Sequence, residues 1–217
     1  MRLYSYAASA NCLKVRQLLR ILERPYEHVE VDIFAGDTLT DAYARLNPLR
    51  ETPVLELDDG TPLTQSNAIL GYLADGTPWA ASDRLEGAQI AAWLVFEQER
   101  VMGGIGGPRF RLITGRAGAE RLAGRVAVGR GALDVLQARL AERPWLVGAG
   151  PTIADVSVAA YTSVAGDVGL DLAGWPAVAA WLDRLRAVPG FVDDLEPYPP
   201  NARPDAGRSI YDPAPAL

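Results

Sequence analysis

The chain has 217 residues and a formal charge of −6, from 21 basic and 27 acidic side chains. Hydrophobic residues make up 49%, enough for the core of one large domain or two small ones. The acidic balance argues against binding nucleic acid through a general positive field. No apolar run approaches the roughly 20 residues that span a bilayer, and no signal-like segment opens the chain. We therefore expect a cytoplasmic protein with no membrane partner.

A single cysteine and a single histidine limit the chemistry that the chain can carry. Cys12 has no second cysteine to pair with, so an internal disulfide is excluded. Cys12 and His28 together supply too few ligands for a zinc-type cluster, and we expect no metal site.

The first third of the chain alternates between strand and helix patterns. Period-2 alternation predicts strands, apolar residues at helical spacing predict helices, and an Asp-Gly turn predicts an antiparallel hairpin. The first strand, helix and strand form a βαβ unit with a parallel pair. The expected order is strand, helix, strand, helix, strand, strand, helix, at residues 1–6, 11–23, 26–32, 40–46, 53–58, 62–64 and 66–74.

The rest of the chain, after a linker at 76–83, shows only helical patterns. A run of glycines at 103–107 is expected to break the first helix, and a proline-rich tail from Pro197 is expected to run extended over the surface or to be partly disordered. The sequence thus predicts a domain at 1–76 and an all-helical one at 83–217. The expected helices are 84–102, 117–142, 153–168, 176–187 and 190–195.

Four short segments stand out on this framework. The first follows a strand, the second precedes a strand, the third opens the helix after the hairpin, and the fourth is a capping box in the helical half. Because Ser and Asn are common helix caps, the residues alone leave a purely structural role open for the first and third segments. The Thr-Pro pair of the second segment would, on its own, be an ordinary loop proline. In chain order the segments are YSYAASANCLKV (4–15), NPLRETPV (47–54), QSNAI (65–69) and TIAD (152–155).

These segments and the order of elements resemble the glutathione S-transferase family over nearly the whole chain, in particular its bacterial, serine-using, theta- or nu-like members. The resemblance implies an α/β thioredoxin-like N-terminal domain followed by an all-α domain. It also implies glutathione as co-substrate, a hydrophobic small-molecule electrophile as second substrate, and a homodimer.

The resemblance places the glutathione thiol beside the first loop. Ser9 stands where serine-using members donate a hydrogen bond to the sulfur, and some bacterial relatives use an asparagine at the position of Asn11. A hydroxyl and helix N-terminal N–H groups favour the thiolate, which is the nucleophilic form of a thiol whose free pKa is about 8.5. We expect Cys12 on the inward face of the helix, with a reactive thiol there as the minority alternative.

The second and third segments are implied to hold the rest of glutathione. Pro53 is expected in cis, so that the backbone of Thr52 bonds the cysteinyl part of glutathione. Ser66, at a helix N-terminus, would bond the γ-glutamyl carboxylate, and Gln65 the α-amino group. Thr52 and its preceding glutamate depart from the family pattern, which leaves Arg50 or another residue to contact the glycine carboxylate. The expected glutathione-binding set is Arg50, Glu51, Thr52, Pro53, Gln65, Ser66 and Asn67.

The helical half is implied to wall the second substrate's pocket with Phe96, Arg100, Met102 and Phe110. Simple core packing is an equal alternative for Phe96 and Met102, and Asp155 of the capping box is expected to act in folding only. The favoured function is conjugation of glutathione to an electrophile. A glutathione-dependent disulfide or peroxide reductase and a non-catalytic binding or assembly module are alternatives, because this fold serves many functions.

Overall fold

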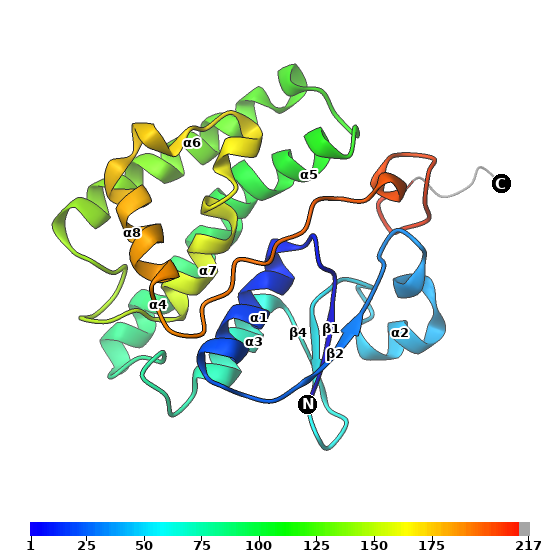
Figure 1. The fold of residues 1–217 in the computed structure, drawn as a ribbon, viewed down its shortest axis with the longest axis horizontal. Coiled ribbons are helices and arrows are strands. Elements are labelled where there is room, and N and C mark those ends of the chain that lie inside the picture. Colours follow the sequence, from blue (N-terminus) through cyan, green and yellow to red (C-terminus); the bar gives the residue numbers. More distant parts are fainter. Residues whose placement is uncertain (213–217) are drawn as a thin grey trace.

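The computed structural model describes residues 1–212, which form a small mixed sheet with helices beside a larger helical bundle (Figure 1). The four strands are ordered β2-β1-β3-β4. The β1 and β2 pair is parallel, with Leu3 opposite His28, and the other two pairs are antiparallel. This is the topology that the βαβ unit and the Asp-Gly turn predict. The strands are β1 (Arg2–Ser5), β2 (Glu27–Glu30), β3 (Val54–Glu56) and β4 (Pro62–Thr64).

Three helices belong to the sheet domain: α1 (Ala10–Ile21), α2 (Asp41–Leu46) and α3 (Ser66–Ala74). Helix α1 packs on α3 and also on α7 (Ile153–Thr162) of the helical half, so the two domains share one apolar core. The α1 helix begins at a Ser9 cap, whose Oγ accepts a hydrogen bond from the Cys12 backbone N–H at 3.4 Å. Cys12 itself is fully buried, as expected from its place on the helix.

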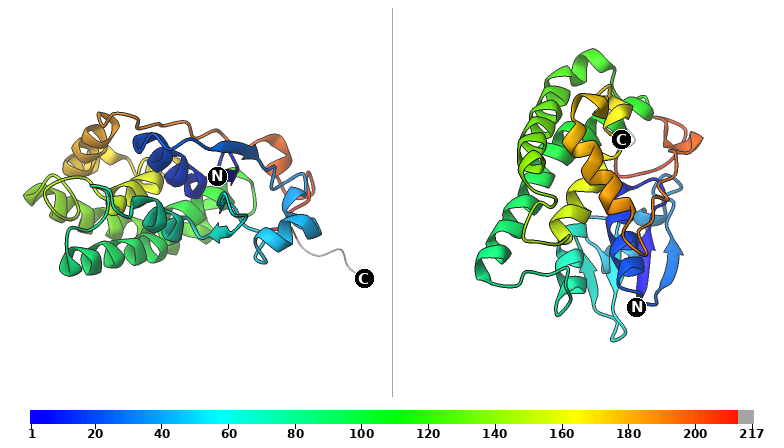
Figure 2. Two further views of the ribbon diagram at one scale, coloured as in Figure 1. Left: turned by 90° about the horizontal axis from the view of Figure 1, so that it is seen from below. Right: turned by 60° about the vertical axis from the view of Figure 1, so that its left-hand side comes forward.

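The helical half contains one long continuous helical run and three further helices. Figure 2 shows this bundle lying to one side of the sheet domain. A π-helix (Glu97–Gly106) connects α4 to α5 without an interruption. The elements besides α7 are α4 (Arg84–Phe96), α5 (Gly107–Ile113), α6 (Ala119–Glu142) and α8 (Pro176–Arg186).

The expectation that glycines at 103–107 break the first long helix is wrong. The run continues because its glycines allow close packing rather than ending the helix. A Cβ on Gly104 would lie 2.6 Å from the Cα of Gly129 in α6, and one on Gly106 would lie 2.6 Å from Cδ1 of Tyr161. Tertiary contact thus overrides the low helix propensity of glycine.

The capping box at the start of α7 is confirmed. Thr152 caps the helix, and the Asp155 carboxylate accepts a hydrogen bond from the Thr152 backbone N–H at 2.9 Å. Asp155 is fully buried and also accepts from Trp181 Nε1 at 2.9 Å and from the Leu146 N–H at 3.0 Å. These contacts give Asp155 the folding role expected of it.

The tail after α8 leaves the bundle and runs back across the sheet domain (Figure 1). The prediction of a helix at 190–195 is wrong, because this segment makes hydrogen bonds and an ion pair with side chains of α1 instead of helical hydrogen bonds within itself. Gln17 Nε2 donates to the Val192 carbonyl at 2.8 Å, and Arg16 pairs with Asp194 at 2.8 Å. Farther on, the Arg208 N–H donates to the Phe34 carbonyl at 2.7 Å. The expected domain at 83–217 includes residues 213–217, which lie outside the described residues.

No helix in the described part of the chain combines the length and apolar character needed to cross a membrane. Within residues 1–212 there is also no group of three His, Cys, Asp or Glu side chains that could hold a metal ion.

Candidate functional site

A cavity of about 390 Å³ lies where the sheet domain, the helical bundle and the tail meet. One side of it is polar and comes from three separate segments of the sheet domain. The other side is largely aromatic and comes from the bundle and the tail. The polar side is lined by Ser9, Asn11, Thr52, Pro53, Gln65 and Ser66.

The start of α1 supplies the first part of the polar side. Ser9 lines the cavity while its Oγ accepts from the Cys12 N–H, so its hydroxyl hydrogen stays available to a ligand. The capping role of Ser9 therefore does not prevent its hydroxyl from donating into the cavity. Asn11, the second residue of the helix, lines the same wall.

The segment before β3 supplies the second part. The Thr52–Pro53 peptide bond is cis, as expected, and both residues line the cavity together with Glu51. The Glu51 carbonyl is held by two buried donors, Tyr43 Oη at 3.0 Å and Asn47 Nδ2 at 2.9 Å. The backbone at Thr52 is therefore fixed against α2.

The start of α3 supplies the third part. Ser66 is the first residue of the helix, where backbone N–H groups have no partner within the helix and attract an anion. Gln65 precedes it with a φ of 66° and a ψ of 110°, a conformation that is rare for a residue other than glycine. Such strained backbone concentrates at ligand sites, and Gln65 lines this cavity.

A buried polar cluster lies directly behind this wall. Asn11 Oδ1 accepts from Lys14 Nζ at 2.9 Å and from Ser66 Oγ at 3.2 Å. The Lys14 ammonium also pairs with Glu97 Oε2 at 2.9 Å, and both charged side chains are fully buried. Burial lowers the pKa of Lys14, while the carboxylate of Glu97 acts in the opposite direction.

The aromatic side of the cavity joins the bundle to the tail. The ring of Phe110 lies 4.9 Å from that of Tyr211 and 5.7 Å from that of Tyr198, centroid to centroid. Burial raises the pKa of Tyr211 to about 12 and also raises that of Tyr198, so both hydroxyls are neutral at physiological pH. The residues lining this side include Met102, Phe110, Arg111, Tyr161, Tyr198 and Tyr211.

Two residues expected to bind glutathione lie outside the cavity lining. The Arg50 guanidinium points to the segment just before α2, where it donates to the carbonyls of Thr38 at 2.9 Å and Thr40 at 3.0 Å. Asn67 lies behind Ser66, and its Nδ2 donates to Glu97 Oε2 at 3.1 Å.

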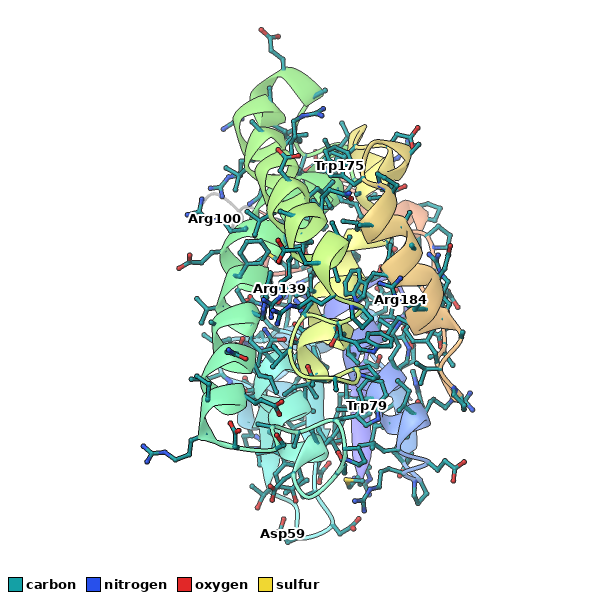
Figure 3. The ribbon with its side chains drawn as sticks, turned by 90° about the vertical axis from the view of Figure 1, so that its left-hand side faces the viewer. Asp59, Trp79, Arg100, Arg139, Trp175 and Arg184 are labelled. Atoms are coloured by element: carbon teal, nitrogen blue, oxygen red, sulfur yellow. The ribbon has the colours of Figure 1, made fainter. Side chains whose placement is uncertain are left out.

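Two residues expected at the second substrate's pocket also lie elsewhere. Phe96 and Arg100 line a groove against α6, and Figure 3 shows Arg100 at the outer edge of the bundle. Met102 and Phe110 do line the cavity.

Sequence reasoning missed residues in the tail, at Lys14, and in the bundle, where Arg111 and Tyr161 line the cavity. Tyr198 and Tyr211 lie in the proline-rich tail, where the only signal was two aromatic residues in a segment without periodicity. Lys14 is the sole lysine among 21 basic residues, yet nothing in its helical spacing indicates burial beside Glu97.

Several known proteins are similar to this chain in both sequence and fold. The glutathione S-transferase N-terminal domain matches residues 8–75, and the corresponding C-terminal domain matches residues 119–184. A solved glutathione S-transferase from Xanthobacter autotrophicus Py2 is 42% identical with a TM-score of 0.84, covering 90% of this chain and 97% of that one.

Two other similar proteins are more distant. Ure2p in complex with glutathione is 26% identical with a TM-score of 0.81, covering 87% of this chain and 95% of that one. Disulfide-bond oxidoreductase YfcG of Escherichia coli is 27% identical over 85% of this chain and 89% of its own length. Glutathione is thus a ligand within this group of relatives. The sequences of both halves and the overall fold all match glutathione S-transferases, and the chain belongs to the glutathione S-transferase family.

Proposed function

We propose that this protein binds glutathione on the polar side of the cavity and transfers its thiolate to a hydrophobic electrophile on the aromatic side. The observation that carries the proposal is the convergence of Ser9, Thr52 and Ser66, from three distant segments, on one wall of a cavity whose opposite wall is aromatic. A tripeptide and an apolar molecule would meet where the two walls join.

The three segments match three parts of glutathione. The N-terminus of α3, with Ser66 and Gln65, suits the γ-glutamyl end, which carries both a carboxylate and an amino group. The backbone of Thr52 suits the cysteinyl part. Ser9 and Asn11 then lie beside the sulfur, where hydrogen-bond donors stabilise the anion. The glycine carboxylate has no assigned partner, since Arg50 points away from the cavity.

The reaction is a nucleophilic attack by sulfur. The bound thiol loses its proton to solvent, and the thiolate forms a C–S bond to an electrophilic carbon while a leaving group such as halide departs with the bonding electrons. A lowered thiol pKa and correct placement of the two reactants supply the catalysis. Tyr198, Tyr211 and Phe110 would stack on a flat apolar substrate.

Glutathione-dependent disulfide reduction is the second candidate function. It is favoured by the likeness to YfcG, whose name is disulfide-bond oxidoreductase. The thiolate of one bound glutathione would attack a disulfide sulfur and displace the first substrate thiolate, leaving a mixed disulfide. The thiolate of a second glutathione would attack the glutathione sulfur of that mixed disulfide, giving glutathione disulfide and the second substrate thiolate. Cys12 is fully buried and would take no part.

A homodimer in the cytoplasm completes the proposal. The groove against α6 that holds Phe96 and Arg100 also contains the exposed side chains of Val128 and Val135. Val95 on α4 adds a further exposed apolar side chain. A second copy covering this face would remove these residues from water, and sedimentation of the purified protein tests it.

Calorimetric titration with glutathione tests the binding site. Saturable binding is expected, and Ser66→Ala should weaken it about 10- to 100-fold, because a hydrogen bond to a charged group contributes about 1.5–3 kcal/mol. Ser163→Ala, which removes a hydroxyl bonded only to the Ala160 carbonyl, is the matched control and should bind normally. No binding up to millimolar glutathione would refute the proposal.

Two assays then separate the candidate activities. Turnover of an aryl halide with loss of halide supports conjugation, and turnover of a glutathione mixed disulfide supports reduction. Tight glutathione binding with neither activity would instead favour a binding or assembly module.

A further inference from the structure

The side-chain amide of Asn11 has only one orientation that its surroundings accept. Its Oδ1 receives hydrogen bonds from Lys14 Nζ at 2.9 Å and Ser66 Oγ at 3.2 Å. The ammonium can only donate, so Lys14 alone requires an oxygen at this position, and it still does so when the Ser66 hydroxyl turns toward a bound carboxylate. The flipped amide would bring its own N–H₂ group against the Lys14 ammonium, where donor would face donor. Nδ2 is therefore the polar end of Asn11 left for a ligand.

Lys14 does not reach the cavity itself. Its ammonium is fully buried between Asn11, the Glu97 carboxylate at 2.9 Å and the face of the Tyr161 ring, 5.3 Å from the ring centroid. Lys14 is absent from the cavity lining, whereas Asn11 and Tyr161 are part of it. Any effect of Lys14 on a bound ligand has to pass through a neighbour, and Asn11 is the one it holds by a hydrogen bond.

Glu97 is held as firmly as Lys14. Its Oε2 accepts from Asn67 Nδ2 at 3.1 Å, Gln98 Nε2 at 2.9 Å and Ser157 Oγ at 3.3 Å. These partners come from α3, the π-helix and α7. A buried ion pair contributes little net stability compared with apolar residues of the same size. Its value lies instead in the fixed position that it gives to the ammonium.

We infer that Lys14, anchored by Glu97, is a positioning residue that holds the Asn11 amide with its N–H₂ group toward the cavity, so that Asn11 donates a hydrogen bond to the glutathione sulfur. The inference rests on the proposed function, since it assigns a role at the same thiol site. Asn11 becomes the principal donor to the thiolate and Ser9 the second.

The test measures the pKa of the bound glutathione thiol, read as the ultraviolet absorbance of the thiolate against pH. The variant is Lys14→Met with Glu97→Gln, which removes both charges together and leaves no unpaired charge in the core. The pKa of the bound thiol should rise by about 1, toward its free value of about 8.5, because the Asn11 amide is no longer held with its donor toward the sulfur. Affinity for S-methylglutathione, which has no thiol to ionise, should stay within about threefold of wild type.

A cycle with Asn11 separates positioning from direct electrostatics. In the Asn11→Ala background the Lys14→Met and Glu97→Gln changes should leave the pKa of the bound thiol unmoved. A rise of the same size in that background would overturn the inference. Arg16→Met removes another buried cation of α1, one that pairs with Asp194 and bonds Ser5, and it should not change the thiol pKa. An equal rise in Arg16→Met would equally overturn the inference.

Asn11→Asp tests the geometry without touching Lys14. The carboxylate keeps an oxygen for Lys14 and replaces the N–H₂ donor by an acceptor, so the pKa of the bound thiol should rise above that of free glutathione. An unchanged thiol pKa would mean that Asn11 does not face the sulfur. Failure of the wild-type protein to bind either glutathione or S-methylglutathione would overturn the proposed function. Normal binding of both, with the same thiol pKa in every variant, would overturn this inference alone.

Discussion

Ser9 combines two tasks in a single side chain. As the N-cap of α1 it accepts a hydrogen bond from the Cys12 N–H, and it lines the cavity at the same time. Ser9→Ala removes the cap and the hydroxyl together. We expect it to lower the free energy of unfolding by about 1 kcal/mol, measured by urea denaturation, and to lower turnover at neutral pH.

Ser9→Asp separates the two tasks, because aspartate is an equally good N-cap but its carboxylate has no hydrogen to donate to the sulfur. Its stability should match wild type while its turnover stays low. Wild-type turnover in Ser9→Asp would show that Ser9 acts only as a cap.

The residues of the polar wall could be proposed from the sequence because the segments that hold them resemble those of the glutathione S-transferase family, whereas the chain pattern alone left a purely structural role open for each. Ser9 precedes a periodic helix, Pro53 precedes a strand, and Ser66 follows a hairpin. Arg50 shows the limit of this reasoning. Its sequence position near Thr52 is right for a ligand contact, but its left-handed backbone, with a φ of 57°, accompanies a side chain bonded to the segment before α2. Side-chain direction of that kind has no sequence signal.

At the scale of elements, two glycines set how the π-helix and α6 pack. A Cβ on Gly129 would lie 2.6 Å from the Gly104 carbonyl oxygen, so neither residue can gain a side chain without moving a backbone. We expect Gly104→Ala and Gly129→Ala each to lower the free energy of unfolding by about 3 kcal/mol, measured by urea denaturation.

Gly87→Ala in α4 is the matched control for these two variants. Its added Cβ meets only the Ala81 Cβ at 3.7 Å, an ordinary contact, so it should raise stability by about 0.5–1 kcal/mol. Equal losses of unfolding free energy in all three variants would show that the close contact between Gly104 and Gly129 is not the cause of the destabilisation.

The elements could be predicted well where periodicity is strong and poorly where packing decides. The strands and α1 follow from their patterns. The π-helix does not, because a shift of its backbone hydrogen bonds by one residue changes no residue type. That shift occurs in the segment holding Glu97, Met102 and Gly106, which supplies both the anchor of Lys14 and part of the cavity wall.

At the scale of the whole molecule, the tail completes the lining of the cavity. Beyond Pro197 it brings Tyr198 and Tyr211 onto Phe110, and Arg116 ties it down through Asp212 at 2.7 Å and the Ala202 carbonyl. Deletion of residues 197–217 should raise the KM for an aryl halide about tenfold, since two aromatic contacts are lost. Glutathione affinity should stay unchanged. Steady-state kinetics with each substrate varied in turn make the measurement.

The paired change Tyr198→Phe and Tyr211→Phe controls for that deletion, because it keeps both rings and removes only hydroxyls. It should leave the KM for the aryl halide near the wild-type value. An unchanged KM after the deletion would mean that the tail takes no part in the electrophile's pocket.

The buried pair of Lys14 and Glu97 also constrains how the two domains can be recombined during evolution. Lys14 comes from the sheet domain and Glu97 from the helical one, so each half carries one charge that only the other half neutralises. A recombination event that joined this first domain to an unrelated helical domain would leave an uncompensated ammonium in the core, at a cost of about 3–5 kcal/mol. The two halves can therefore be exchanged among relatives only as a matched set, with an acid retained at the start of the π-helix.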